Sequence, residues 1–149
     1  MQTPSSAIVW SVLRINLVSG YLLPAQAADT GLQGTWIATE ARRDGKAAED
    51  VVGHTLSISE NTFEISSKNG KHLYAGNVRI DSDAKPAAID FEHKEGDLSG
   101  KSWKGVYALE GDTLKICDNA PNLNAARPTA LKAPSGSGYV LVTFKRAKP

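Results

Sequence analysis

The chain has 149 residues, which is enough for one domain of ordinary size and too few for two. Hydrophobic residues make up 41% of it and charged residues 22%, so the composition excludes a disordered or fibrous protein. Lys and Arg number 17 and Asp and Glu number 16, a balance that argues against nucleic acid as a partner. The single cysteine, Cys117, excludes an internal disulfide framework and a cysteine-rich zinc site.

The first 27 residues differ in composition from the rest. Arg14 is their only charged residue, apolar runs flank it, and the segment ends in A-Q-A at 25–27. This pattern is typical of a secretory signal peptide cleaved after residue 27. The alternatives are a disordered tail or an uncleaved membrane anchor, since a spanning helix needs about 20 mostly apolar residues. We therefore expect a signal peptide at 1–27 and an exported domain at 28–149, periplasmic or extracellular. Contact with a membrane is expected only if the segment stays attached.

The remaining chain shows the apolar–polar alternation of strands and almost no helical periodicity. The alternation predicts eight strands, at residues 35–41, 54–59, 62–67, 71–80, 88–93, 102–109, 113–117 and 139–146. Asn69-Gly70 separates two of them and suits the positive φ of a tight hairpin turn. One short helix is expected at 47–52. The predicted fold class is all-β, an eight-stranded antiparallel up-and-down barrel without exposed sheet edges; an open or two-sheet sandwich is the alternative.

The two ends of such a barrel are predicted to differ. At one end the connections are short, at 60–61, 81–87 and 110–112. At the other end three of the four are long, at 42–53, 94–101 and 118–138. Binding residues tend to lie on such loops, so this end is predicted to be a mouth. The prolines of 118–138 exclude a helix, and the segment is expected to fold over the mouth, with Leu123 or Leu131 as an apolar contact and Arg127 exposed to a partner.

Trp36 and Arg146 are expected to be neighbours at the closed end. In an up-and-down barrel the start of the first strand lies beside the end of the last strand. An arginine across the tryptophan ring would contribute about 1–2 kcal/mol as a partly desolvated cation–π contact. The G-T-W sequence at 34–36, with a basic residue on the last strand, resembles the lipocalin pattern.

A closer resemblance covers almost the whole of residues 28–149. It is carried by L-Q-G-T-W at 32–36, R-D-G-K at 43–46, G-V-Y at 105–107, G-D-T-L-K-I-C at 111–117, R-P-T at 127–129 and L-V-T-F-K-R at 141–146. These segments resemble a family of small bacterial lipocalin-like domains that is expanded in planctomycetes, often exported and without an established activity. The resemblance implies a barrel but no substrate. The chain is shorter than true lipocalins and has a proline-rich loop in place of their helix, so a cavity as deep as theirs is not implied.

The sequence contains no motif for catalysis or metal binding, and we predict no catalytic residue, no metal and no cofactor. The histidines His54, His72 and His93 lack the spacing of a local metal pair. His72 and His93 are interpreted as exposed residues at strand ends. Cys117 is interpreted as a partly buried, inert thiol, with an intermolecular disulfide as the alternative.

The inward-facing aromatic residues form the candidate binding set. Eight-stranded barrels are just wide enough to be filled by side chains or to hold one small ligand. Gly105, between Trp103 and Tyr107, leaves space or marks a bend of its strand. The residues predicted to bind a ligand are Phe91, Trp103, Tyr107, Leu123 and Arg127.

Three functions are compatible with this pattern. The first is an exported, non-enzymatic barrel that binds a small apolar molecule or a protein partner at its mouth. The second is a structural or interaction module with a filled core, which recognises a protein or a cell-surface polymer. The third is an enzyme whose site no local motif reveals. An apolar pocket of a few hundred Å³ favours the first, and a buried carboxylate or histidine with a shifted pKa favours the third.

Overall fold

The computed structural model describes residues 31–148, so the expected cleavage site after residue 27 lies outside the described residues. The strands are β1 (Gly34–Arg43), β2 (Lys46–Ala47), β3 (Thr55–Ser59), β4 (Thr62–Ser66), β5 (His72–Asp81), β6 (Ala87–His93), β7 (Ser102–Glu110), β8 (Thr113–Asp118) and β9 (Val140–Arg146). A 3₁₀ helix, η3 (Gly96–Leu98), joins β6 to β7. Within residues 31–148 no helix has the length and apolar character needed to cross a bilayer.

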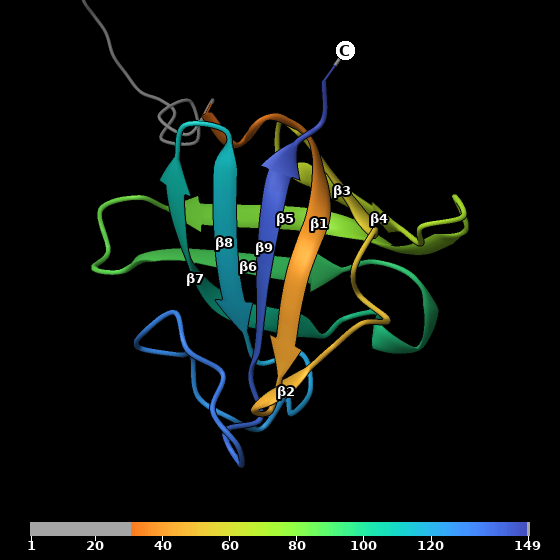
Figure 1. The fold of residues 1–149 in the computed structure, drawn as a ribbon. Helices are drawn as coiled ribbons and strands as arrows, with labels where there is room; N and C mark the ends of the chain where they lie inside the picture. The colour runs from red at the N-terminus through yellow and green to blue at the C-terminus, as the bar shows by residue number, and fades with distance from the viewer. Residues whose placement is uncertain (1–30, 149) are drawn as a thin grey trace, which may run out of the picture.

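The long strands close into an antiparallel barrel, as the alternation predicted. From β3 to β9 each strand pairs with the next in the chain, β1 pairs with β3, and the pairing of β1 with β9 completes the circle. Figure 1 shows β1 and β9 side by side, with β5 and β6 crossing behind them. The eight predicted strands match the eight strands of the barrel, with boundaries that differ by only a few residues.

The helix predicted at 47–52 is wrong. Lys46–Ala47 forms the short strand β2 instead, which pairs with the end of β1. The turn between them is Asp44-Gly45, whose φ angles of 54° and 86° suit a tight hairpin. This hairpin takes Ala47, the first residue of the predicted helix, into β2, and the chain then continues in turns to β3.

One end of the barrel, which we call the floor, is closed by Trp36 and Arg146. The two residues are paired between β1 and β9, and the guanidinium carbon of Arg146 lies 4.3 Å from the centre of the Trp36 ring. Arg146 also donates hydrogen bonds to the carbonyl oxygens of Gln33 (2.9 Å) and Gly31 (2.8 Å), and to the carboxylate of Asp112 (3.1 Å). The predicted neighbourhood of Trp36 and Arg146 is therefore confirmed.

The apolar residues of the alternating strands point into the barrel and form its core. Buried members on β3, β4, β6 and β8 are Leu56, Ile58, Phe63, Ile89, Phe91, Leu114 and Ile116. His93 shares the inward face of Ile89 and Phe91 and is only 1% exposed, so its expected exposure is wrong. His72 is exposed, as expected.

The long connection between β8 and β9 does not fold over the mouth as predicted. Its first residues stand at the rim, but the rest packs on the outer face of the barrel wall. There, Arg127 donates hydrogen bonds to the Asp90 carboxylate (2.6 Å) and to the Gly105 carbonyl oxygen (2.9 Å). The expected exposure of Arg127 to a partner is wrong, because β6 and β7 already supply its anionic and carbonyl acceptors.

The outer wall needs this cover because two of its outward-facing residues are apolar. Val106 and Cys117 are paired across β7 and β8 and are 1% and 0% exposed. Pro128 and Ala133 of the long connection are buried as well. The Cys117 thiol donates to the Lys132 carbonyl oxygen at 3.3 Å, and burial raises its pKa to about 11, which fits the expected inert thiol.

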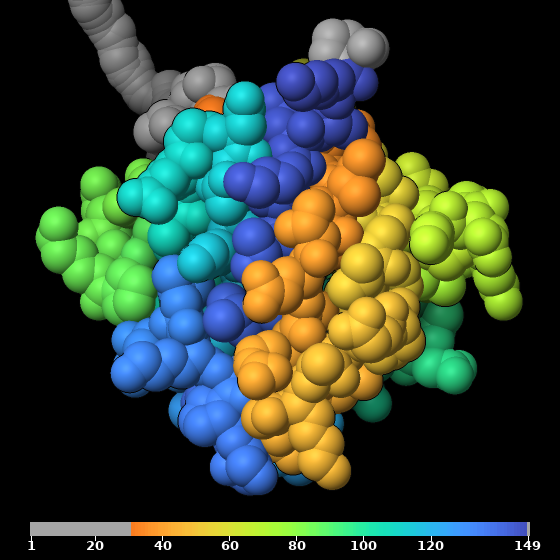
Figure 2. All heavy atoms as spheres, in the orientation of Figure 1, coloured from red at the N-terminus to blue at the C-terminus, as the bar shows by residue number. Residues whose placement is uncertain are grey.

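The long connection is also tied to the β1–β2 turn. The backbone N–H of Gly45 donates to the carbonyl oxygen of Ala133 (2.7 Å), and the backbone N–H of Gly138 donates to the Asp44 carboxylate (2.9 Å). In Figure 2 the residues that follow β1, in orange and yellow, meet the blue long connection along the lower part of the visible face. The two segments therefore brace each other beside the mouth and leave the barrel open.

Candidate functional site: a cavity at the mouth

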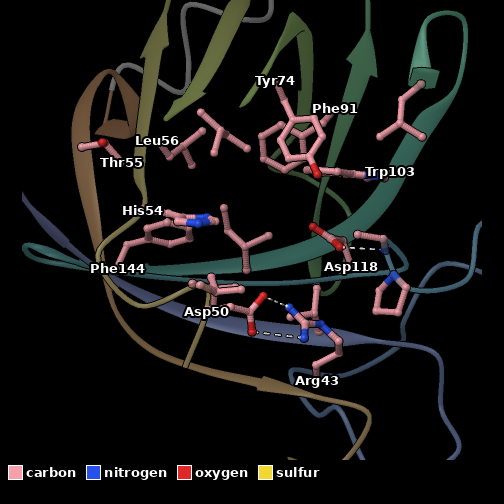
Figure 3. A pocket seen from close by; sticks show the side chains of 18 residues that line it. Arg43, Asp50, His54, Thr55, Leu56, Tyr74, Phe91, Trp103, Asp118 and Phe144 are labelled. Atoms are coloured by element: carbon pink, nitrogen blue, oxygen red, sulfur yellow. Dashed lines mark hydrogen bonds and ion pairs between the residues drawn. The ribbon is translucent and has the colours of Figure 1, made fainter. Parts of the chain in front are cut away.

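The end of the barrel opposite the floor contains a cavity of about 310 Å³. It extends from rim residues such as Asp50, Leu98 and Pro121 down to Leu56 and Ile116 on the strands. Most of its lining is apolar (Figure 3). The interior is thus packed near the floor and hollow near the mouth, so the filled-core interpretation does not describe the whole barrel.

An aromatic cluster forms one wall of the cavity. Trp103 contacts Tyr74 edge to face, with ring centres 4.9 Å apart, and Phe91 at 6.1 Å. Such contacts are worth about 0.5–1.5 kcal/mol each beyond the area that they bury. The three rings support one another, so the wall is preorganised without a ligand.

His93 packs behind this wall and does not line the cavity. Its ring lies 4.2 Å from the Trp103 ring and 5.5 Å from the Tyr74 ring. Neither ring nitrogen has a hydrogen-bond partner among the described residues. Burial lowers the pKa of His93, so the imidazole is neutral and serves as a packing ring.

Asp118 is the polar residue that stands out in the cavity. It lies at the mouth end of β8, is 7% exposed and lines the cavity. The backbone N–H of Ala120 donates to its Oδ1 at 2.9 Å, whereas no described residue donates a hydrogen bond to Oδ2. Burial raises the pKa of the carboxyl group to about 7. Figure 3 shows the carboxylate pointing into the cavity.

Gly105 explains how Asp118 fits there. The two residues are paired between β7 and β8. A Cβ on Gly105 would lie 2.8 Å from the Asp118 Cβ and 2.6 Å from the Cys117 carbonyl oxygen, closer than real contacts allow. The glycine therefore permits the close approach of β8, a role that differs from both sequence interpretations, space for a ligand and a bend of the strand.

An ion pair stands at the rim. Arg43 donates two hydrogen bonds to Asp50, from Nη1 to Oδ1 (3.2 Å) and from Nη2 to Oδ2 (2.7 Å). These hydrogen bonds raise the pKa of Arg43 and hold that of Asp50 below its usual value. The two charges neutralise each other locally, although solvent exposure makes the pair a minor source of stability.

The predicted binding residues are only partly brought together. Phe91 and Trp103 line the cavity. Tyr107 is buried nearer the floor, Leu123 packs against the edge of the core, and Arg127 lies outside the barrel wall; none of these three lines the cavity. Their positions follow from strand direction, since β7 runs from mouth to floor and places Tyr107 below Gly105.

Asp118, Tyr74 and the Arg43–Asp50 pair were missed in the sequence. For Asp118 a signal existed, because Leu114, Ile116 and Asp118 alternate on one inward face of the same strand. The predicted strand ended one residue too early, at 117, so Asp118 was treated as the first residue of a loop.

No metal site accompanies the cavity within residues 31–148, where no group of three His, Cys, Asp or Glu residues could hold a metal ion. His72 lies outside the barrel between Glu64 (2.8 Å) and Glu95 (2.7 Å). The hydrogen bonds to these carboxylates raise the pKa of His72.

Comparison of the chain with family models, with curated proteins and with solved structures gives no match. The resemblance to small bacterial lipocalin-like domains therefore stays a prediction, while the barrel itself follows from the strand pairing.

Proposed function

We propose that the protein is an exported, non-enzymatic barrel that binds one small, largely apolar molecule in its mouth cavity. The observation that carries the proposal is the cavity itself. Its volume of about 310 Å³ is at the lower end of ligand pockets, which span about 300–1,000 Å³ and combine apolar walls with a few placed polar groups. Export is proposed from the leader-like composition of residues 1–27.

The lining supports a small-molecule ligand over a protein partner as the occupant. The aromatic wall lies inside the barrel, where a folded protein surface cannot reach it. Polar groups are few and placed on different sides, which is how pockets orient one ligand. A protein partner would bind to the rim loops instead.

The test uses a neutral apolar dye, N-phenyl-naphthylamine, whose fluorescence rises in apolar surroundings. Wild-type protein is expected to bind it, and Val142→Trp, which fills the cavity with an indole, is expected to abolish binding. The matched control is Ile37→Trp, because Ile37 is exposed on the outer face at 39% and adds the same ring outside the cavity. Equal binding by both variants, with both folded by circular dichroism, would contradict the proposal.

An enzyme is the second candidate, and one observation favours it. A buried carboxyl group with a pKa of about 7, as in Asp118, suits general acid–base chemistry near neutral pH. Binding and catalysis differ in what becomes of the bound molecule. Native mass spectrometry of protein isolated from the exported fraction is expected to show a ligand that is released unchanged; conversion during incubation would favour the enzyme.

A further inference from the structure

Two polar groups in the mouth cavity can accept a further hydrogen bond and have no donor among residues 31–148. The structure gives no partner within residues 31–148 for Oδ2 of Asp118 or for the hydroxyl group of Tyr74, and both residues line the cavity. Figure 3 shows the Tyr74 hydroxyl oxygen and the Asp118 carboxylate pointing toward the same part of the cavity. Unsatisfied polar groups inside an apolar pocket cost stability, so they are expected to have a partner in the complex.

We propose that the ligand of the mouth cavity is an organic cation, a small amine with an apolar body, whose ammonium group pairs with Asp118. This inference rests on the proposed binding function and specifies the chemical class of the ligand.

The charges that face the cavity support a cation. Its ionisable lining residues are Arg43, Asp50, His54, Tyr74 and Asp118. Arg43 and Asp50 neutralise each other through their two hydrogen bonds. Asp118 remains as the acid of the lining that has no cationic partner within the described residues 31–148. A cationic ligand would complete the charge balance, and an anionic ligand would oppose it.

The aromatic wall supports the same class of ligand. Cations are attracted to Trp, Tyr and Phe rings within about 6 Å of the ring centre, and more strongly where water is excluded. Tyr74, Phe91 and Trp103 line the cavity together with Asp118. An ammonium group offers up to three N–H donors, enough for Oδ2 of Asp118 and the Tyr74 hydroxyl group.

The protonation state of Asp118 distinguishes a cationic ligand from a neutral ligand that carries a carbonyl group. With a pKa of about 7 the carboxyl group is mostly ionised at about pH 8 and mostly protonated at about pH 5.5. A cation requires the ionised form. A neutral ligand with a carbonyl group would instead accept a hydrogen bond from the protonated form and would bind better at low pH.

The experiment compares three probes with one aromatic skeleton: phenethylamine, phenethyl alcohol and hydrocinnamate, which are a cation, a neutral molecule and an anion. Their dissociation constants are measured by isothermal titration calorimetry on the full chain at about pH 8 and pH 5.5. The amine is expected to bind at least about tenfold more tightly than the alcohol at pH 8, and the anion most weakly. The amine is expected to lose roughly 30-fold in affinity at pH 5.5, following the ionised fraction of Asp118.

Three variants locate the effect. Asp118→Asn is expected to remove both the preference for the amine and its pH dependence. The double variant Arg43→Gln with Asp50→Asn removes the rim acid together with the cation that neutralises it, and is expected to keep both. His54→Gln removes the imidazole that also lines the cavity, and it too is expected to keep the pH dependence.

The outcomes separate the two proposals. Equal binding of amine and alcohol, or tighter amine binding as the pH falls, overturns the cation proposal and leaves the apolar pocket intact. A preference that persists in Asp118→Asn overturns it also. Failure of every probe and of the neutral dye overturns the binding function itself.

Discussion

Arg146 at the floor and Asp118 at the mouth of this barrel are both withdrawn from solvent, but they differ in how completely their polar atoms are hydrogen-bonded. At the floor, Arg146 lies over Trp36 and donates to two carbonyl oxygens and one carboxylate. At the mouth, Asp118 accepts one backbone hydrogen bond and faces an empty volume of about 310 Å³.

The difference shows where stability and binding reside in the molecule. A buried group whose hydrogen bonds are complete holds its neighbours in place, as Arg146 does between the first and last strands. A buried group left incomplete costs free energy and persists where function needs it. The floor is therefore expected to set the stability of the barrel, and the mouth to carry its specificity.

The largest expected effect is at the floor. Trp36 is fully buried, and its indole N–H donates to the Leu32 carbonyl oxygen at 3.1 Å. Trp36→Ala is expected to lower the free energy of unfolding by about 3–5 kcal/mol, since it leaves a large cavity and removes the cation–π contact. Urea denaturation measures the loss, with Ile37→Ala, at the next and exposed position, as the control. A loss below about 1 kcal/mol would show that the floor does not dominate stability.

At the mouth, Asp118→Asn is expected to raise the free energy of unfolding, whereas Trp36→Ala lowers it. The folded state raises the pKa of Asp118 from 3.8 to about 7, so the folded protein binds a proton that the unfolded chain has released. The wild-type protein therefore loses stability as the pH rises from about 4 to about 7, by up to about 4 kcal/mol at 1.4 kcal/mol per pKa unit.

The asparagine variant cannot ionise and is expected to escape this loss. The difference in the free energy of unfolding between the variant and the wild type should be absent near pH 3, grow as the pH rises toward 7 and level off above pH 7. Urea denaturation of the ligand-free proteins across this range measures it. Asp50→Asn serves as the contrast. Arg43 lowers the pKa of Asp50, so replacing this carboxylate is expected to lower the free energy of unfolding at neutral pH. A destabilised Asp118→Asn at pH 8 would mean that the carboxylate has a partner in the folded protein.

The sequence was sufficient for the fold and for the floor. Strand alternation and tight turns such as Asn69-Gly70 are local signals, and the pairing of Trp36 with Arg146 follows from closing the strands in chain order. The short hairpin at Asp44-Gly45 was missed because a pattern of small and acidic residues after it suits a helical turn equally well.

The mouth could be predicted only in part. The inward direction of Phe91 and Trp103 follows from the alternation of side chains along a strand. How far an inward side chain lies from the mouth depends on the stagger of the strands. That stagger places Tyr107 below the cavity. Arg127 was misplaced because its acceptor Asp90 is 37 residues away in the chain. The free volume is a property of the whole interior and has no local signature.

A smaller effect is expected where the long connection is fastened to the outer wall. Arg127→Ala removes the hydrogen bonds to Asp90 and Gly105 and is expected to cost about 1–2 kcal/mol, as for a partly buried charge-assisted bond. The connection should loosen while the barrel stays closed. Cys117, which it covers, reports this: its reaction with a maleimide is expected to be slow in the wild type and faster in the variant. Unchanged thiol reactivity would mean that other contacts hold the segment.

The smallest effect is expected from His72, an exposed residue near the mouth that is hydrogen-bonded to two carboxylates. Its hydrogen bonds to Glu64 and Glu95 raise its pKa above the ordinary 6.5, so the stabilisation is complete below that value and is lost as the pH rises through the raised pKa. Nuclear magnetic resonance titration of the imidazole should find the raised pKa, and Glu64→Gln with Glu95→Gln should return it toward 6.5. His72→Gln is nevertheless expected to leave the unfolding midpoint unchanged, because water screens exposed pairs. A clear loss of stability in His72→Gln would show that polar pairs at the mouth also stabilise the barrel. It would contradict the expectation that stability is set at the floor.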